Sequence, residues 1–552
     1  MANNASIQDA GTYDFVIVGG GSAGCVLANR LTESGVSVLL LEAGKWDRDP
    51  LIHIPVGIGK IFPERLHDWG YFMEPDPGID GRGIECARGR VIGGSSSINI
   101  MAYVRGHRED YDRWARSGLD GWSYADVLPY FRRSETWEGG VDAFRGGAGP
   151  LHVQRTRYRD GILGDFIEAG RQAGYPVTAD YNGAHQEGFD YIQETIHGGR
   201  RNSAATAYLR PAMRRPNLRI IVGARADRIE MTEGRATGVH FTEAGRRQLA
   251  HARREILLTS GVINSPKLLM LSGIGDPKQL TANGIGVELA NPHVGGNLRD
   301  HLSVMASYRR KSPSWFQQQM RYDRLAVAML KSLLRMDGFA SDVPIGVTAF
   351  LKTRQGLAAP DVQFLFLAAP FPARPYLPPF TRPFADGFGC RVALLRPEST
   401  GSVILASADP DVKPKIIPNF LSSERDRETL REGLRILRST MRQPAMANHI
   451  LQENAPGTAV EDDEALDAFI RATSVTVHHP ACTCRMGSAT DSRRVVDEAL
   501  RVVGTEGLRV VDASVMPDLV GGNINAVVMM IAEKASDMIL GKAPLPRADV
   551  AA

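Results

Sequence analysis

Two adjacent histidines and two nearby cysteines make residues 476–487, TVHHPACTCRMG, the segment most able to do chemistry. A histidine such as His478 or His479 titrates near neutral pH and could exchange a proton with a substrate. Histidine and cysteine also bind zinc, but zinc sites usually place two to four residues between cysteines and add further ligands. Cys482 and Cys484 are separated by one residue and have no companion cluster, so we predict no metal site. Proton transfer and a purely structural histidine both remain compatible with the segment.

A glycine-rich turn near the N-terminus predicts a binding site for a dinucleotide. Gly19, Gly21 and Gly24 form G-x-G-x-x-G after a short apolar run, residues 15–18, and at the start of a helical pattern. In such a turn the first glycine permits the sharp bend, the second lets the backbone approach a pyrophosphate, and the third lets the helix pack on the strand. The N-terminus of the helix then faces the phosphate charge.

The segment after this turn completes a βαβ unit. A second apolar run, residues 36–41, predicts a buried strand that ends at Glu42, where a carboxylate would meet a ribose hydroxyl. An acidic side chain there disfavours the 2′-phosphate of NADP, but the motif does not choose between FAD and NAD. Because no second strand, glycine turn and helix of this kind follows, one dinucleotide is the simpler interpretation.

A second glycine cluster, residues 93–97 (GGSSS), offers many backbone N–H groups and hydroxyls. It is a poor interior for a helix or a strand, so it predicts a loop that contacts a polar ligand. A flexible linker is the alternative, although the apolar residues that follow at once would anchor the loop.

The composition is that of a folded globular protein. The 552 residues are 43% hydrophobic and 23% charged, with 57 glycines and 32 prolines that predict many turns. The net charge of +3 and the scattered arginine pairs give no sign of a nucleic-acid partner. Five cysteines, no signal-peptide pattern and no apolar run of membrane-spanning length lead us to expect a cytoplasmic protein without a membrane span.

The motifs, in their order along the chain, resemble those of the glucose–methanol–choline (GMC) oxidoreductases. The resemblance runs from Tyr13 to about Leu540 and is greatest with the bacterial branch that includes L-sorbose dehydrogenase. The segments that carry it, after the dinucleotide turn, are residues 88–112, 261–275, 294–301, 476–487 and 512–533.

This resemblance implies that the dinucleotide is FAD. Some family members tether the flavin through a histidine in the second glycine loop, but Ile98 stands at that place, so we expect non-covalent FAD. The residues expected to bind it are Gly19, Gly21, Ser22, Ala23, Gly24, Glu42, Ala43, Val91, Gly94, Ser95, Asn99, Ala102, Ala226, Asp512, Ala513 and Asn525.

The same resemblance assigns catalysis to His479 and Asn523. His479 would accept the hydroxyl proton of an alcohol, and Asn523 would hydrogen-bond the substrate oxygen. A helix expected from Asn525 to Met538 would direct its N-terminus at the flavin, where it stabilises negative charge. Cys482 replaces a glycine of the family pattern, so we expect it near the active centre and sensitive to alkylation.

The implied activity is oxidation of a primary or secondary alcohol to an aldehyde or ketone, with hydride transfer to flavin N5. The acceptor of the electrons, other than NAD(P), is a quinone, a dye-like acceptor, a cytochrome or O₂. An oxidase that reduces O₂ to H₂O₂ is the nearest alternative activity, and a flavin-containing hydroxynitrile-type lyase is a more distant one.

We expect an α/β architecture in which two domains interleave. A Rossmann-like FAD-binding domain with a parallel sheet would comprise residues 1–154, 215–305 and 486–552. Residues 155–214 and 306–485 would form a substrate-binding domain built on an antiparallel sheet with helices, including strands near 364–367, 391–395 and 402–406. An amphipathic helix at 322–336 predicts a lid, an interface or plain core packing. The proline-rich segment 370–384 predicts either a roof over the substrate entrance or a surface or oligomer contact.

Overall fold

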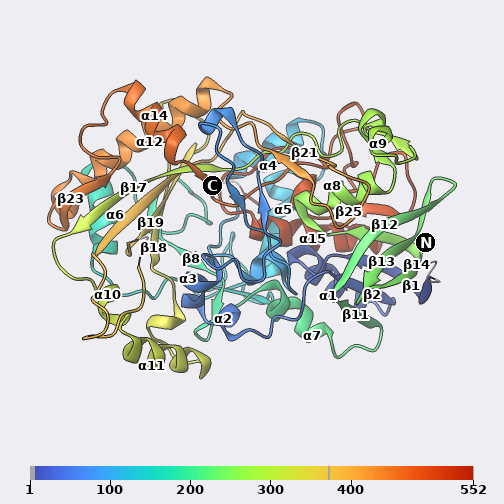
Figure 1. Cartoon of the computed structure of the whole chain (residues 1–552), viewed down its shortest axis with the longest axis horizontal. Coiled ribbons are helices and arrows are strands. Elements are labelled where there is room, and N and C mark those ends of the chain that lie inside the picture. Colours follow the sequence, from blue (N-terminus) through green and yellow to red (C-terminus); the bar gives the residue numbers. More distant parts are fainter. Residues whose placement is uncertain (1–6, 371–372, 551–552) are drawn as a thin grey trace.

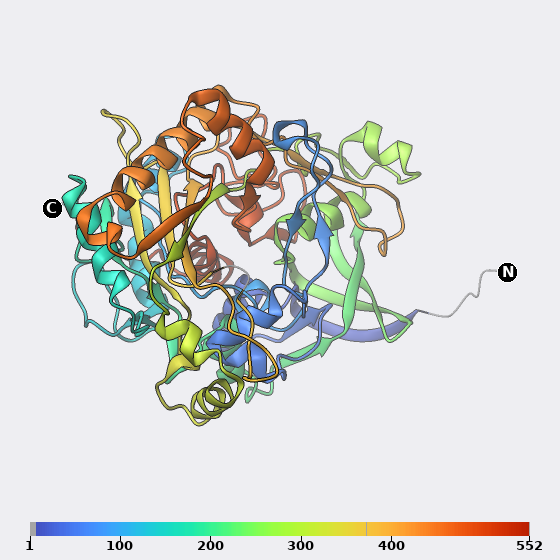
Figure 2. The ribbon, with the colours of Figure 1, turned by 60° about the vertical axis from the view of Figure 1, so that its left-hand side comes forward.

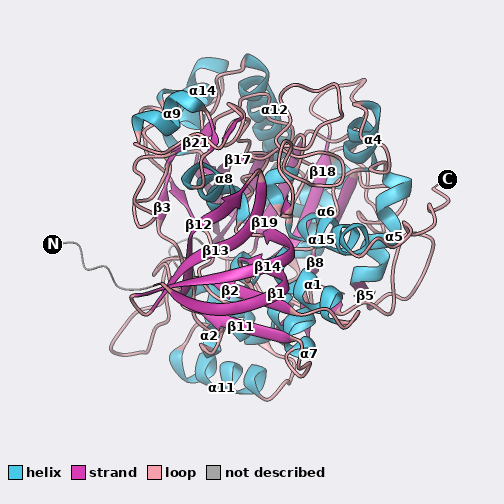
Figure 3. Cartoon of the chain, turned by 90° about the vertical axis from the view of Figure 1, so that its right-hand side faces the viewer, coloured by secondary structure: helices cyan, strands magenta, loops and turns pink. Residues whose placement is uncertain are grey.

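A mixed seven-stranded sheet carries the glycine-rich turn (Figures 1 and 3). The computed structural model describes residues 7–370 and 373–550, and its main strand order in this sheet is β11-β2-β1-β14-β13-β12, with β25 beside β14. The pairs β11–β2, β2–β1, β1–β14 and β14–β25 are parallel, whereas β12, β13 and β14 form an antiparallel meander. The strands are β1 (Gln8–Val18), β2 (Val38–Glu42), β11 (Leu218–Val222), β12 (Ala224–Thr232), β13 (Arg235–Glu243), β14 (Arg246–Leu258) and β25 (Leu508–Val510).

The parallel centre of this sheet is buried on both faces, which explains its continuous apolar sequence. All five residues of β2 and the last four of β1 are buried. Helix α1 (Ser22–Thr32) begins just after β1 and packs against α15 (Asn525–Ile539), which in turn packs against α5 (Tyr124–Ser134). Gly24 lies where α1 meets the sheet, and a Cβ there would lie only 1.9 Å from the Gly19 carbonyl oxygen. No side chain fits at that contact.

The second large sheet is antiparallel throughout, as expected for the substrate domain. Its order is β23-β17-β20-β19-β18-β7, with β24 beside β17. Helices α6 (Ile162–Gln172) and α12 (Glu424–Met441) pack on it, and Figure 2 shows α12 in orange beside the yellow strands. The strands are β7 (Gly188–Tyr191), β17 (Leu302–Arg310), β18 (Ile345–Leu351), β19 (Val362–Leu367), β20 (Gly387–Leu394), β23 (Ile450–Ala455) and β24 (Val475–Thr476).

One strand expected in this sheet lies elsewhere. The segment near 402–406 forms β21 (Ser402–Ile404), which pairs with β22 (Lys415–Ile417) in a separate two-stranded sheet. Short alternating runs predict a strand but not its partner, because pairing depends on where the chain returns.

The fold-class prediction is confirmed, and both sheets draw strands from distant parts of the chain. Residues 8–42, 218–258 and 508–510 contribute to the first sheet, whereas residues 188–191, 302–394 and 450–476 contribute to the second. We therefore retain the interleaved domain boundaries given above as a proposal. None of the helices in the described residues has the length and apolar character needed to cross a bilayer.

Candidate active site

A cavity of about 1130 Å³ opens where the two sheets face each other. Val18 and Leu41, at the carboxyl ends of β1 and β2, line it on one side, and Met305 and Leu365 of the second sheet line it on the other. Ligands of α/β folds bind outside the carboxyl ends of parallel strands. The volume exceeds the roughly 300–1,000 Å³ of most ligand pockets, so a large cofactor and a substrate have room together.

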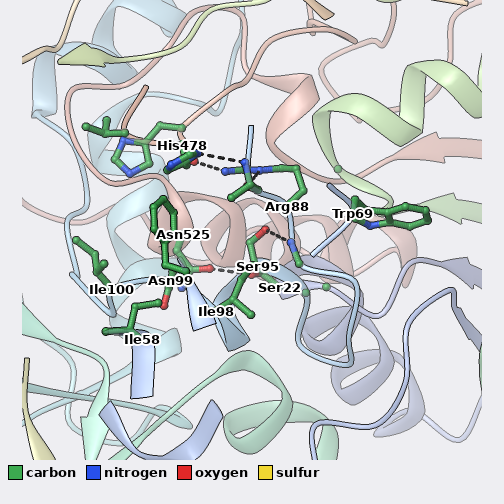
Figure 4. A pocket seen from close by; sticks show the side chains of 18 of the residues that line it. Ser22, Ile58, Trp69, Arg88, Ser95, Ile98, Asn99, Ile100, His478 and Asn525 are labelled. Carbon is green, nitrogen blue, oxygen red and sulfur yellow. Dashed lines mark hydrogen bonds between the residues drawn. The ribbon is translucent and has the colours of Figure 1, made fainter. Parts of the chain in front are cut away.

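The two glycine loops meet at the base of this cavity. Gly94 has a φ of +55°, and a Cβ on it would lie 2.7 Å from the Cα of Gly21. Ser22 donates a 2.7 Å hydrogen bond from Oγ to Asn525 Oδ1, which joins the start of α1 to the start of α15. In Figure 4, Ser22, Ser95, Asn99 and Asn525 lie together, facing His478 and Arg88. The second cluster is thus an anchored loop and not a linker.

Glu42 lies at the end of β2 with both carboxylate oxygens engaged. Oε2 accepts a hydrogen bond from the Gly20 N–H and Oε1 accepts one from the Gly44 N–H, each at 2.7 Å. Burial raises the pKa of Glu42 to about 7. The carboxylate lines the cavity and keeps a lone pair on each oxygen for a hydroxyl donor.

Sixteen of the eighteen expected site residues line the same cavity, and the exceptions are Gly24 and Val91. Gly24 lies instead at the contact between α1 and the sheet described above. Val91 packs in an apolar cluster with Ile52, Ile61 and Ile98. The sixteen are Gly19, Gly21, Ser22, Ala23, Glu42, Ala43, Gly94, Ser95, Asn99, Ala102, Ala226, His479, Asp512, Ala513, Asn523 and Asn525.

Asp512 borders the cavity, but its carboxylate mainly holds the protein together. Its oxygens accept hydrogen bonds from the Gly261 N–H, the Ser265 hydroxyl, and the N–H and hydroxyl of Ser514. These bonds tie the start of α8 (Gly261–Leu271) to the turn after β25. Asp512 therefore shapes the cavity wall through its neighbours.

His479 and Asn523 face each other inside the cavity. Asn523 Nδ2 lies 3.1 Å from His479 Nε2, and His479 Nδ1 lies 3.1 Å from His301 Nδ1. His301 Nε2 lies 3.1 Å from the Leu395 carbonyl oxygen. A histidine, a second histidine and an amide are thus connected in a row that ends at a backbone carbonyl.

Only one placement of hydrogens satisfies this row when both histidines are neutral. The Leu395 carbonyl can only accept, so His301 carries its hydrogen on Nε2 and accepts at Nδ1. His479 must then donate from Nδ1, which leaves Nε2 as an unprotonated acceptor facing Asn523. Burial lowers the pKa of His301 to about 4 and holds the pKa of His479 well below its usual range, so both are neutral near pH 7.

A buried glutamine fixes the orientation of the Asn523 amide. Gln363 Nε2 donates to Asn523 Oδ1 at 3.3 Å and to Thr348 Oγ1 at 3.1 Å. The Thr348 hydroxyl donates onward to the Phe364 carbonyl oxygen at 2.9 Å. Because Asn523 Oδ1 is held as an acceptor, its Nδ2 donor points at His479 Nε2.

Sequence reasoning assigned no role to His301, Asp300, Gln363 or Arg88. Asp300 accepts hydrogen bonds from the His479 N–H at 2.9 Å and from the Thr476 hydroxyl, and burial raises its pKa to about 6. Arg88 donates to the His478 carbonyl. His301 and Asp300 lie in the VGGNLRDH segment that carries the family resemblance, which was the available signal. Gln363 gave no such signal, because a single polar residue within a predicted strand does not indicate a functional role.

The expectation that Cys482 is sensitive to alkylation disagrees with its burial in the structure. Cys482 is fully buried and does not line the cavity, and burial raises the pKa of its thiol far above the usual range. A protonated thiol without access to solvent reacts slowly with alkylating reagents. All five cysteines lie within the described residues and none of them forms a disulfide.

Comparison with known proteins identifies the family. The GMC oxidoreductase N-terminal model matches residues 13–303, and the C-terminal model of the same family matches residues 397–532. The chain is a GMC oxidoreductase. The resemblance to the GMC oxidoreductases drawn from the motifs is thereby confirmed at the level of the family.

Relatives of this GMC oxidoreductase match it over nearly its whole length. The oxygen-dependent choline dehydrogenase of Rhizobium johnstonii is 43% identical over 537 residues, which cover 97% of each chain. The solved pyridoxine 4-oxidase from Mesorbium loti is 32% identical with a TM-score of 0.83, covering 95% of this chain and 98% of that one. A formate oxidase variant of Aspergillus oryzae, studied for FAD modification, is 27% identical with a TM-score of 0.88, covering 97% and 99%.

This GMC oxidoreductase is an FAD-dependent enzyme that oxidises alcohols at CH–OH groups. The cavity fits that cofactor, because Gly21 and Gly94 expose backbone without side chains to it and approach so closely that a Cβ on Gly94 would lie 2.7 Å from the Gly21 Cα. We propose that Ser22, Glu42 and Asn525 hold FAD beside these glycines. When bound, FAD supplies the hydride acceptor.

Acid denaturation should release free FAD into the supernatant and leave a colourless protein pellet. Ile98, at the place of the tethering histidine, is an apolar side chain that packs beside Val91 and lines the cavity, so it cannot bond to a flavin. Absorbance of both fractions after precipitation with trichloroacetic acid measures this. Yellow colour that stays in the pellet would show a covalent link through another residue.

Proposed function

We propose that this GMC oxidoreductase oxidises an uncharged alcohol with an apolar substituent, and that His479 and Asn523 carry the chemistry. The observation that supports the proposal most directly is the neutral His479, whose Nε2 acceptor faces the Asn523 Nδ2 donor at 3.1 Å. A hydroxyl group that lies beside this pair, within reach of both nitrogens, can donate its proton to His479 Nε2 while its oxygen accepts from Asn523 Nδ2. Loss of the proton raises the electron density on oxygen, which promotes departure of hydride from the adjacent carbon.

The row of buried partners behind His479 prepares it for this step. His479 Nδ1 donates to His301, which anchors the ring through the Leu395 carbonyl. The Asp300 carboxylate accepts the His479 N–H, which holds the backbone of the same residue. An anchored ring loses little conformational freedom when the substrate binds.

The second sheet presents an apolar face with one cation to the substrate. In β19, Gln363, Leu365 and Leu367 alternate toward one face, and Leu365 pairs across the sheet with Arg391, which pairs with Met305. Burial, and after it the positive charges of Arg88 and Arg391, lower the pKa of His478 to about 3, so two cations lie close to the neighbour of His479. That environment suits a neutral apolar alcohol.

Choline is the second candidate, because it is named in relatives that are 43% identical. Its trimethylammonium group is best held by a carboxylate or by aromatic faces. The carboxylates that line the described part of the cavity are Glu42, Glu64 and Asp512. Glu42 and Asp512 are engaged by neighbouring N–H and hydroxyl groups, and Glu64 is exposed beside Lys60. None of the three belongs to the second sheet, where Arg391 lies. The aromatic rings that line the cavity and keep choline as the second candidate are Phe62, Trp69, Tyr71, Phe316 and Tyr322.

Anaerobic flavin bleaching with benzyl alcohol, 1-hexanol, sorbitol and choline tests this substrate class. We expect kcat/KM for the apolar alcohols to exceed that for choline at least tenfold, which corresponds to about 1.4 kcal/mol. Arg391→Gln should raise kcat/KM for choline about tenfold and change that for benzyl alcohol little. Arg391→Lys, which keeps the charge, serves as the matched control. Fast bleaching by choline in the wild-type enzyme would make choline the substrate, and no bleaching by any alcohol would contradict the whole proposal.

The observations that bear on the electron acceptor and on the compartment are less specific than those on the substrate. H₂O₂ formed under air, compared with dye reduction under nitrogen, separates an oxidase from a dehydrogenase. Substrate-induced bleaching in either case argues against a lyase. The five buried thiols are compatible with a reducing compartment, so we propose the cytoplasm.

A further inference from the structure

Helix α11 (Tyr322–Leu333) is apolar on two sides, and only one of them is covered. Leu325 and Met329 line the cavity, and Ala328 is buried beside them. On the opposite side, Val327 and Leu330 are 55% and 57% exposed, and Leu334 just after the helix is 63% exposed. The spacing of these three residues, at i, i+3 and i+7, places them along one stripe. Plain core packing, one expectation for this helix, therefore accounts for the apolar side that is covered and not for the opposite, exposed side.

The proline-rich segment extends this exposed stripe. The Tyr322 N–H donates a 3.0 Å hydrogen bond to the Tyr376 carbonyl, so the segment lies against the start of α11. Phe380 is 84% exposed and Leu377 is 39% exposed. Residues 371 and 372 of the segment lie outside the described residues, whereas Pro370, Arg374 and Pro375 line the cavity as a roof would. The α11 surface, as we name it, consists of Val327, Leu330, Leu333, Leu334, Leu377 and Phe380.

The α11 surface lies at one edge of the molecule and at the mouth of the cavity. Figures 1, 2 and 3 all show α11 projecting at the lower edge. Tyr322, which is exposed on α11, also lines the cavity, as do the exposed residues Phe62 and Lys60. Part of the cavity lining is therefore exposed at the start of α11, next to the α11 surface.

Cations surround the α11 surface. Arg324, Lys331 and Arg335 are exposed, and within the described part of the chain no ion pair engages them. Arg374 and Arg382 add two more exposed cations from the proline-rich segment. The nearby acids are already neutralised, because Asp323 pairs with Arg321 and Asp337 pairs with Arg157.

We infer that the α11 surface binds an anionic phospholipid bilayer, with the mouth of the cavity opening into the interface. Exposed leucines and phenylalanine bordered by Arg and Lys are the composition of helices that lie in such interfaces. A second copy of the chain fits less well, because a twofold contact would bring the same cations of both copies face to face. This binding does not depend on the proposed substrate or on the catalytic residues.

Flotation of the FAD-loaded enzyme with lipid vesicles tests the inference. We expect binding to vesicles of phosphatidylcholine mixed with phosphatidylglycerol, weak binding to phosphatidylcholine alone, and release by high salt. Leu330→Asp should lower the bound fraction at least tenfold, and Lys331→Glu should lower it several-fold. Val287→Asp is the matched control, because Val287 is 45% exposed near α9 (Pro277–Ala282), which lies far from α11 in Figure 1.

Thermal unfolding and FAD content show whether each variant is folded. If Leu330→Asp does not fold, Lys331→Glu still tests the inference. No binding of the wild-type enzyme to anionic vesicles would overturn the inference. So would an equal loss in Val287→Asp. A stable dimer in sedimentation velocity that Leu330→Asp dissociates would assign the surface to a second copy instead.

Discussion

Replacing His479 by alanine should slow flavin reduction by about 10²–10⁴-fold while FAD stays bound. This variant lacks the His479 Nε2 acceptor that faces Asn523. The substrate hydroxyl therefore keeps its proton as hydride leaves. The imidazole of His479 contacts His301 and Asn523, and the glycine backbones of Gly21 and Gly94 that line the cavity are unchanged in the variant. Anaerobic stopped-flow absorbance at saturating benzyl alcohol measures the effect, and the flavin-to-protein ratio checks the bound FAD.

The neighbouring histidine provides the control for this result. His478 lies in the same cavity, but its Nδ1 accepts a hydrogen bond from the Ala87 N–H and it has a φ of +63°. Asparagine tolerates that backbone conformation, so His478→Asn should keep flavin reduction within about tenfold of the wild-type rate. If His478→Asn lost as much as His479→Ala, or if His479→Ala reduced its flavin at wild-type speed, the assignment of the base would be wrong.

Replacing His301 by leucine should slow flavin reduction by about 10²–10⁴-fold, although His301 itself does not line the cavity. Without the Nδ1 acceptor of His301, His479 is free to place its hydrogen on Nε2, where it can no longer accept the substrate proton. His301→Gln offers an amide oxygen as an acceptor and should recover at least part of the rate. Equal losses in both variants would indicate damage to packing in place of a role in positioning His479.

The pH dependence of stability provides a second readout for His301. Burial lowers its pKa from 6.5 to about 4, so the unfolded chain binds the proton first as pH falls. The neutral imidazole therefore contributes stability fully above pH 6.5, and this contribution is lost as pH falls toward 4. Between neutral pH and about pH 5, the unfolding free energy of the wild type should fall ~2 kcal/mol more than that of His301→Leu. Parallel denaturant titrations of both proteins measure the difference, and identical pH profiles would contradict a neutral buried His301.

The glycine turn and its strands could be predicted from sequence because their information is local. Residues 15–18, the turn from Gly19 to Gly24 and residues 36–41 are neighbours in the chain, and their apolar periodicity and backbone freedom constrain the structure directly. His479 and Asn523 required the family resemblance, since neither residue alone distinguishes catalysis from a structural role. Cys482 shows the limit of position within a motif, because proximity in sequence to His479 did not place its thiol in the cavity.

By itself the sequence determined the dinucleotide turn and the fold class, and its motifs pointed to His479 and Asn523 as the side chains that we propose meet the substrate. Only the tertiary structure decided which nitrogen of His479 is left as an unprotonated acceptor, because that choice depends on His301, on the Leu395 carbonyl and on Gln363 behind Asn523. It also decided that one apolar side of α11 is left uncovered. The physical reason is the same in both cases. Hydrogen-bond direction and burial are properties of atoms that come together from distant parts of the chain, and no local pattern of residues specifies them.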